Sequence, residues 1–340
     1  MSSDRSTPRW PDDGWVTYAT GRRVSVRSLA GGTGPSGGPA LRDVVGVLER
    51  AAPAQWTIRK RTGERVTVDP GQVVSAITVP DLPARLRSAS DVEVGALEVV
   101  AADGWQPLER EQLGDWVLRA AGGFTGRANS VLPIGDPGSD LDVALEAVKA
   151  WYSARALTPM LQVPLPLRDD LQAALSERGW DHHNPTQVMV CDLPPLAMAT
   201  ESGGADDETC TVAASPDSDW LQALRYRGMP LQADVASILT LNEHPVFVTV
   251  RGSAGDVRAV GRGALTGHWL GVTAVEVVEA FRRRGLGRRV IGALAEYALG
   301  HGVRHVYLQV AKGNDPAIAL YERLGFVRHH DYVYRRWSAG

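Results

Sequence analysis

One stretch decides the fold: Val277-Val278-Glu279-Ala280-Phe281-Arg282-Arg283-Arg284-Gly285-Leu286-Gly287, followed by Arg288. It predicts the end of a strand, a turn of arginine and glycine, and the N-terminus of an apolar helix. Two closely spaced glycines let backbone N–H groups approach an anion, and the helix dipole favours negative charge there. The stretch therefore predicts a site for a phosphate or a pyrophosphate.

A second signal follows this turn. The sequence continues with Asn314-Asp315-Pro316-Ala317, then Tyr321, then Gly325-Phe326. Periodicity predicts strands over 271–278 and 305–310 and helices over 286–299 and 315–324. Strands that alternate with helices in this way are typical of an α/β arrangement.

Bulk properties narrow the class of protein. The 340 residues carry 36 Lys and Arg against 39 Asp and Glu, a net charge of −3, which gives no global case for nucleic acid. The five arginines between Phe281 and Val290 are therefore a local feature. No run approaches the length of a membrane helix, the N-terminus lacks a signal peptide, and two cysteines without ligand spacing predict no metal site. We expect a cytoplasmic enzyme.

The pattern of the N-terminal quarter predicts a separate β-sheet domain. Residues 1–15 are polar and are expected to be disordered. Apolar and polar residues alternate over 23–27, 56–60 and 65–69, with a flexible loop expected over 30–40 and a hairpin turn at Thr62-Gly63. Four or five short strands predict a small SH3-like β-barrel over 16–85.

Two α/β stretches follow, over 90–195 and 210–340, with a Gly- and Asp-rich linker over 196–209. They share an order of elements, and each has a Gly-aromatic pair after its last helix, which indicates a tandem duplication. The first stretch has acidic residues where the arginine turn should fall, so we expect it to be a degenerate copy. The predicted fold class is α+β.

The second stretch resembles the GNAT superfamily of acyl-CoA N-acyltransferases. The resemblance covers residues from Cys210 onward and rests on Arg282-Arg283-Arg284-Gly285-Leu286-Gly287 and the spacing to Asn314, Tyr321 and Gly325-Phe326. It implies acetyl-CoA as co-substrate, without a metal, and two tandem GNAT-like folds behind the barrel. The implied acetyl-CoA site consists of Val277, Val278, Glu279, Arg282, Arg283, Arg284, Gly285, Leu286, Gly287, Arg288, Asn314 and Tyr321.

The resemblance also implies catalytic roles. The pantetheine arm would lie between strands 273–278 and 305–310, where the N–H near Val278 would polarise the thioester carbonyl. Asn314 would bond the pantetheine, and Tyr321 would protonate the leaving thiolate. Glu276 is the candidate base, because strand alternation puts it on the face of Ala274 and Val278.

Simpler interpretations stay open beside these roles. The two glycines could form an ordinary turn, and the arginines could form a solvated patch. Tyr321 could be a packed core residue on an apolar helical stripe, and Asn314 could cap a helix. Glu276 could be a solvated strand residue.

The whole chain resembles an actinobacterial group with a small barrel before two GNAT-like halves. The residues that carry this are Trp116-Val117-Leu118-Arg119-Ala120-Ala121-Gly122-Gly123-Phe124-Thr125, Arg127-Ala128-Asn129-Ser130-Val131, Ala150-Trp151-Tyr152 and Gln162-Val163-Pro164-Leu165-Pro166. Some members are labelled short N-acetylglutamate synthases. Arg127, with Asn129 and Ser130, could then hold a substrate carboxylate, or it could be a solvated arginine in a structural turn.

We therefore expect an acetyl-CoA-dependent N-acetyltransferase that acts by direct transfer to a small-molecule amine. L-Glutamate, at the entry to arginine biosynthesis, is the leading acceptor. Another amine, a protein or peptide amine, and a non-catalytic acetyl-CoA sensor are the alternatives. We expect no nucleic-acid or membrane partner, and the sequence leaves room for a homo-oligomer.

Overall fold

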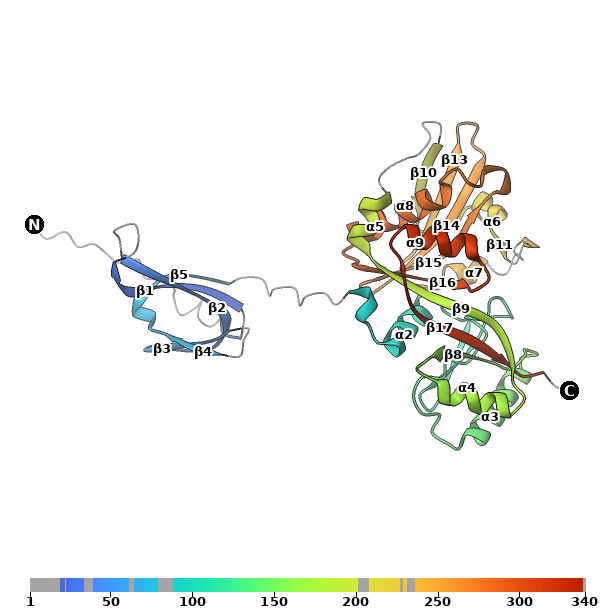
Figure 1. Ribbon diagram of the computed structural model, residues 1–340, viewed down its shortest axis with the longest axis horizontal. Helices are drawn as coiled ribbons and strands as arrows, with labels where there is room; N and C mark the ends of the chain where they lie inside the picture. Colours follow the sequence, from blue (N-terminus) through green and yellow to red (C-terminus); the bar gives the residue numbers. More distant parts are fainter. Residues whose placement is uncertain are drawn as a thin grey trace, which may run out of the picture. The chain divides into compact units, whose positions relative to one another are not determined.

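The chain divides into two compact units, Met1–Leu86 and Arg87–Gly340. Figure 1 shows the computed structural model, which describes residues 19–21, 23–33, 39–60, 64–78, 88–200, 208–226, 229–230 and 236–338. The segment 1–15, expected to be disordered, lies outside the described residues. So does the expected turn at Thr62-Gly63.

The first unit is an antiparallel sheet. Its strands are β1 (Arg23–Thr33), β2 (Pro39–Ala52), β3 (Gln55–Arg59), β4 (Arg65–Val68) and β5 (Val73–Thr78), with a 3-10 turn, η1 (Pro70–Gln72), before β5. The order is β4-β3-β2-β1-β5, so β4 and β5 lie at the two edges of the described sheet. Alternating residues such as Val24, Val26 and Ile58 form its core. The prediction of strands here is confirmed, but the expected loop over 30–40 is wrong at its start, because β1 continues to Thr33 through a bulge after Leu29.

The second unit begins with nine elements from the first α/β stretch. They are η2 (Ala89–Asp91), α2 (Val94–Gly104), β6 (Glu109–Leu113), β7 (Trp116–Ala120), α3 (Leu141–Ser153), β8 (Met160–Leu165), α4 (Asp169–Glu177), β9 (Asp181–Asp192) and α5 (Leu193–Thr200). The apolar stripe of α3, with Leu145, Val148 and Trp151, packs against β7 and β8. The first part of the expected linker lies in α5, and residues 201–207 lie outside the described residues.

The remaining elements belong to the second stretch. They are β10 (Glu208–Ala213), α6 (Ser218–Ala223), β11 (Arg225–Tyr226), β12 (Met229–Pro230), α7 (Ala236–Leu239), β13 (Pro245–Gly252), β14 (Val257–Thr266), β15 (Trp269–Val277), η4 (Glu279–Phe281), α8 (Leu286–Gly300), β16 (His305–Ala311), α9 (Asp315–Arg323) and β17 (Val327–Arg336). The expected strands and helices of this stretch agree with these bounds within a few residues at most ends.

The two stretches share one sheet rather than forming two. Its order is β10-β13-β14-β15-β16-β9-β17-β8. Strand β9 of the first stretch lies between β16 and β17 of the second, and β17 in turn lies between β9 and β8. Figure 1 shows β9 and β17 side by side where the two stretches meet. A tandem repeat read from sequence does not predict this exchange of strands.

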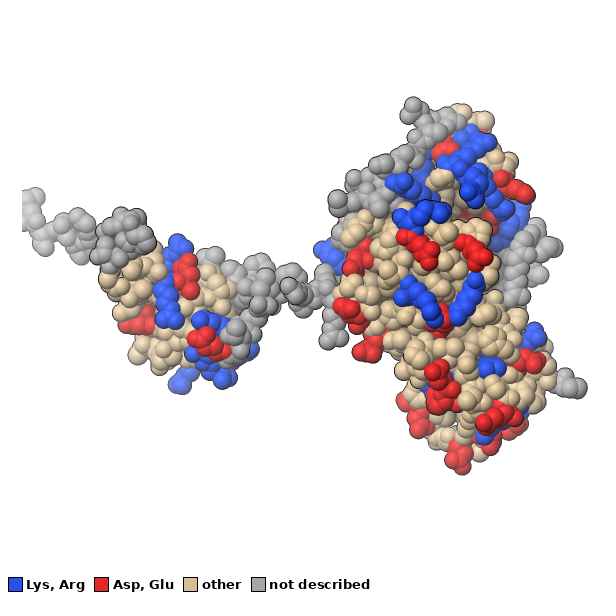
Figure 2. All heavy atoms as spheres, in the orientation of Figure 1, with Lys and Arg blue, Asp and Glu red and all other residues tan. Residues whose placement is uncertain are grey.

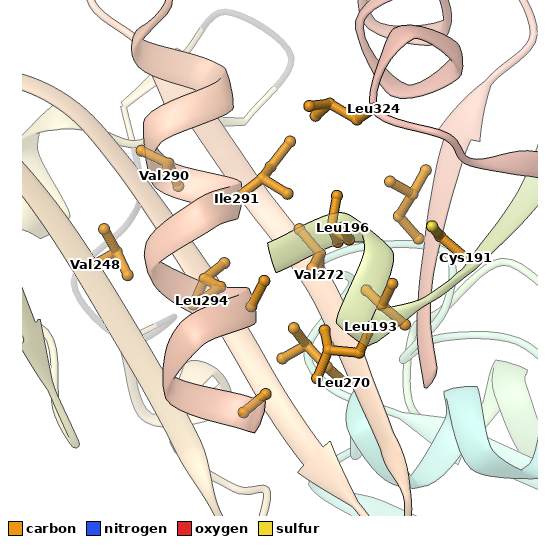
Figure 3. Close-up of a cluster of buried hydrophobic side chains, with 14 of the residues drawn as sticks. Cys191, Leu193, Leu196, Val248, Leu270, Val272, Val290, Ile291, Leu294 and Leu324 are labelled. Atoms are coloured by element: carbon orange, nitrogen blue, oxygen red, sulfur yellow. The ribbon is translucent and has the colours of Figure 1, made fainter. Parts of the chain in front are cut away.

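The main core lies between this sheet and two helices. Ile291 and Leu294 of α8 lie beside Leu196 of α5 in Figure 3, and Val248 of β13 is close to Val290. All five side chains are buried. Helix α8 is thereby held against the sheet, which places its N-terminus beside the end of β15.

Candidate active site

Strands β15 and β16 separate partway along their length. Their parallel pairing runs from Trp269 and His305 to Val272 and Leu308 and then stops, although both strands continue. The opening between residues 273–277 of β15 and 309–311 of β16 is called the slot below. No described strand pairs with this edge of β15, so its backbone N–H groups are available to an extended ligand.

A β-bulge accompanies the separation. On β15 two residues, Ala274 and Val275, oppose the single residue Gly261 of β14. Ala274 has φ 52°, in the left-handed region that non-glycine residues rarely adopt. Bulges bend the strand that carries them and often lie beside active sites, so the bulge gives a physical reason for the divergence of β15.

The arginine turn leads from β15 into α8. Arg283 has φ 65° and Gly285 has φ 84°, and Gly285 is the N-cap of the helix. The first N–H groups of a helix have no intrahelical partner, and the helix dipole makes this end positive. The described turn therefore fits a phosphate group through the amides of residues 283–288.

The arginines of the turn differ in their contacts. Arg282 donates to Val277 O at 3.2 Å and pairs with Glu276 at 3.4 Å. Arg289 is held by the buried Glu208 at 2.8 Å. Arg283 and Arg284 are exposed, and Arg284 lies over the ring of Phe281. Figure 2 shows basic side chains gathered over the end of this unit that carries β10 and β13.

The predicted oxyanion donor needs a correction. The N–H of Val278 donates to Arg258 O at 2.9 Å, across to β14, so it is already used. Successive residues of a strand direct their N–H groups to opposite edges, so the N–H of Val277 points toward the slot. Val277 therefore replaces Val278 as the candidate donor to a thioester carbonyl.

Tyr321 lies on α9, a helix that meets the start of α8 through Leu320. A Cβ added to Gly287 would stand 3.1 Å from Leu320 Cδ2 and 3.9 Å from Val277 Cγ2, so α9, the start of α8 and the end of β15 meet there. The ring of Tyr321 packs against the main core, and burial raises its pKa to about 12. The hydroxyl therefore keeps its proton at neutral pH.

Asn314 and Glu276 have structural partners. The side chain of Asn314 caps α9 by accepting the N–H of Ala317, as the simpler interpretation proposed, and Asn314 also lines a cavity beside β16. Glu276 is the register partner of Val260, which packs in the same cluster as Ala274, so both lie on the face opposite α8. It also forms an ion pair with Arg282 at 3.4 Å.

The three residues predicted to bind the acceptor differ in their hydrogen-bond partners. All four hydrogen bonds of the Asn129 amide go to the backbone of residues 121–125, and the hydroxyl of Ser130 is buried against Arg119. Asn129 lines the same cavity as Arg127, although its amide is engaged by the turn, and Ser130 is not among the described lining residues. The role of these two residues in binding substrate stays a prediction. Arg127 lines the cavity and donates to Gln309 Oε1 at 3.0 Å. Gln309 was not predicted, since nothing in sequence relates residues 182 positions apart.

Two features are absent from the described part of the chain. No group of three or more His, Cys, Asp or Glu residues there could hold a metal ion. No described helix is both long and apolar enough to cross a membrane.

Comparison with known proteins identifies the family. Residues 91–335 match a family model described as the C-terminal part of the probable histone acetyltransferase Rv0428c. The chain belongs to this family. It is a GNAT-type N-acetyltransferase. Residues 18–76 of this acetyltransferase match a model of the N-terminal Sm-like domain of Rv0428c, so the first unit is Sm-like and the SH3-like assignment stays a prediction.

Relatives and solved structures agree with this assignment. The Mycobacterium tuberculosis protein named probable histone acetyltransferase Rv0428c is 32% identical over 325 residues, 92% of this acetyltransferase and 94% of the relative. A GCN5-related N-acetyltransferase from Kribbella flavida has TM-score 0.57 and 17% identity, covering 73% of this chain and 96% of its own. A tandem GNAT protein from the clavulanic acid biosynthesis pathway has TM-score 0.50 and 19% identity, covering 72% and 88%. GNAT folds use acetyl-CoA, and the fold of the second unit is theirs.

Proposed function

We propose that this acetyltransferase moves the acetyl group of acetyl-CoA directly to the nitrogen of a primary amine. The slot is the observation that carries the proposal, because it joins an open strand edge to a helix N-terminus suited to pyrophosphate. Acetyl-CoA supplies the acetyl group as a thioester. The amides of residues 283–288 would hold its pyrophosphate, and Arg283 and Arg284 would add positive charge.

Two residues then serve the transfer. The N–H of Val277 points to where the carbonyl oxygen gains charge as the amine forms its C–N bond. Tyr321 donates its proton to the sulfur as the C–S bond breaks. The cysteines support direct transfer, because burial raises the pKa of Cys191 to about 11 and raises that of Cys210, so neither is a ready nucleophile. The residue that takes the amine proton stays a prediction, with Glu276 as candidate.

Two classes of amine acceptor are candidates for this reaction. L-Glutamate, and with it a place in arginine biosynthesis, rests on the resemblance of the sequence to short N-acetylglutamate synthases. A protein or peptide amine is supported by the printed name of the Mycobacterium tuberculosis relative. Both require the same thioester chemistry in the slot.

Release of free thiol from acetyl-CoA, measured against amino acids, polyamines, aminoglycosides and basic peptides, tests the proposal. We expect Tyr321→Phe to lower kcat about 100-fold with an unchanged KM for acetyl-CoA, since it removes only the proton donor. Tyr297→Phe is the matched control, a partly buried tyrosine of α8 in the same core. Normal turnover by Tyr321→Phe would refute the acid role, and acetyl-CoA binding without thiol release from any amine would favour a sensor.

A further inference from the structure

A cavity of about 680 Å³ lies beside β16, on the face of the sheet that α8 does not cover. The side chains of Leu308 and Val310 pack in the core under α8, so Gln309 between them faces the cavity side. Both α/β stretches contribute to the wall, including Arg127 from the first and Asn314 from the second. Because Gln309 begins the β16 side of the slot, the cavity is placed to hold an acceptor.

The wall of this cavity is basic. Arg127, Arg336 and His183 line it, and no Asp or Glu is among the described lining residues. The Nε of Arg336 is buried without a hydrogen-bond partner in the described structure. A cavity for a lysine side chain or a polyamine would need carboxylates, so this charge favours an acceptor that carries an anion.

The buried carboxylate of Glu98 lies near this wall, but it already has hydrogen-bond partners in the core. Glu98 of α2 acts electrostatically on Tyr332, which lines the cavity. Its carboxylate lies 2.7 Å from His330 Nε2 and accepts from Gln162 Nε2 at 2.5 Å. The carboxylate of Glu98 is therefore engaged by hydrogen bonds inside the core.

Arg127 has a second guanidinium close by. Arg127 lies over the Trp105 ring at 4.8 Å, and the fully buried Arg262 lies over the same ring at 4.9 Å. Arg262 donates to Leu239 O and Gly104 O, while its Nη2 has no hydrogen-bond partner in the described structure. Burial first, and then Arg127, lower the pKa of Arg262 to about 10, so it stays charged at neutral pH. Neither arginine forms a salt bridge within the described residues, and uncompensated buried charge is costly, so an anion would be stabilised here.

We propose that this cavity selects acceptors that carry a carboxylate, with Arg127 as the residue that binds it. The inference rests on the proposed acetyl transfer and names its substrate class. Only one N–H of Arg127 is assigned to Gln309, so the planar guanidinium retains donors for a carboxylate. The cavity volume suits a small molecule such as an acidic amino acid or a short acidic peptide.

Pairs of acceptors that differ only in charge test this selection. We expect kcat/KM at least tenfold higher for L-glutamate and L-aspartate than for their α-amides and for a lysine-rich peptide. Amidation leaves more of the amine neutral and so favours the amide chemically, which makes a preference for the acid more telling. Equal rates for acid and amide, or a preference for the basic peptide, would overturn the proposal.

Variants of Arg127 test whether this residue causes the preference for the acid over the amide. Arg127→Gln should raise KM for the acid at least tenfold and leave KM for acetyl-CoA and the rate with the amide unchanged, and Arg127→Lys should restore part of the preference. Arg110→Gln, an exposed arginine of β6 in the same stretch, is the control. If Arg127→Gln does not fold, Arg336→Gln should reduce the same preference, and an unchanged preference there counts against the proposal.

Calorimetric titration of acid and amide into the protein with coenzyme A separates the two proposals. Tighter binding of the acid supports carboxylate selection even in the absence of turnover, whereas equal binding overturns it. Absence of thiol release bears on the acetyl transfer alone.

Discussion

Gly261 of β14 packs under Val290 of α8 so closely that an added Cβ would stand 2.3 Å from Val290 Cγ1. The same residue faces the bulge at Ala274 that accompanies the opening of the slot. One missing side chain therefore lets the helix that carries the anion site lie directly against the bend in β15.

The first prediction concerns this contact. Gly261→Ala should destabilise the second unit by about 2 kcal/mol, because the new methyl group overpacks the core at Val290. It should also raise KM for acetyl-CoA, since α8 must shift away from β15. Thermal unfolding and initial rates measure both effects. Gly313→Ala, where a Cβ meets nothing within 4 Å, is the control, and a Gly261→Ala protein that melts with the wild type would contradict the argument.

The second prediction concerns the arginine turn. Replacing both Arg283 and Arg284 by alanine should weaken binding of coenzyme A about tenfold, because charged donors to the pyrophosphate are lost. Binding of pantetheine, which lacks the pyrophosphate, should not change. Calorimetry with the two ligands makes the comparison, and Arg323→Ala on the exposed end of α9 is the control. Equal loss for both ligands would count against a phosphate role.

The third prediction concerns the buried pair of Glu98 and His330. Glu98→Gln should lower the free energy of unfolding by about 2 kcal/mol, because it removes one acceptor oxygen from a buried hydrogen-bonded network with Gln162 and His330. The side chains of Glu98 and His330 are 1% and 0% exposed, so water cannot replace the lost partner. Urea unfolding measures the change. Glu93→Gln, an exposed residue just before α2, should have little effect, and a similar result for both variants would refute the assignment.

The fourth prediction concerns pH and Asp192. Burial opposes its charge, but hydrogen bonds from Ala89 N–H, Ser88 and His305 together hold the pKa of Asp192 below its ordinary value. The folded state thus favours the carboxylate, and this contribution to stability is present above the unfolded pKa and is lost as pH falls through the folded pKa. Asp192→Asn should be less stable than wild type at pH 7, with the difference shrinking below about pH 4. Urea midpoints across this range test it, with Glu322→Gln as an exposed control, and a constant difference would contradict it.

The strands and helices around the slot were predictable because their signals are local. The Arg282–Gly287 turn, the period of α8 and the Pro316 at the start of α9 each lie within a few residues of the structure that they specify. The bulge was not predictable, because a positive φ is usually signalled by glycine in the sequence, whereas here alanine, Ala274, adopts it. The N–H of Val278, near which the thioester donor is predicted, is bonded to β14, which leaves that of Val277 as the candidate.

The acceptor side depends on contacts that sequence does not encode locally. Arg127 was singled out on a motif, but Gln309 and Arg262 join it only through the fold. Asn129 and Ser130 stand beside Arg127 in the same motif, yet the amide of Asn129 bonds the backbone of the turn and the hydroxyl of Ser130 accepts from Arg119. A polar residue in a motif can therefore bind a ligand or stabilise the local structure, and only its hydrogen-bond partners distinguish these two roles.

The placement of β17 has a consequence for how the protein is made. Of the strands of this sheet, β8 and β9 emerge first during synthesis, and in the finished sheet they are separated by β17, the last of the described strands to emerge. The sheet of the first stretch therefore lacks the strand between β8 and β9 until β17 has been made. The second stretch, in turn, has no partner for the edge of β16 without β9. A gene split between the two stretches would therefore leave each product short of a strand that the other holds.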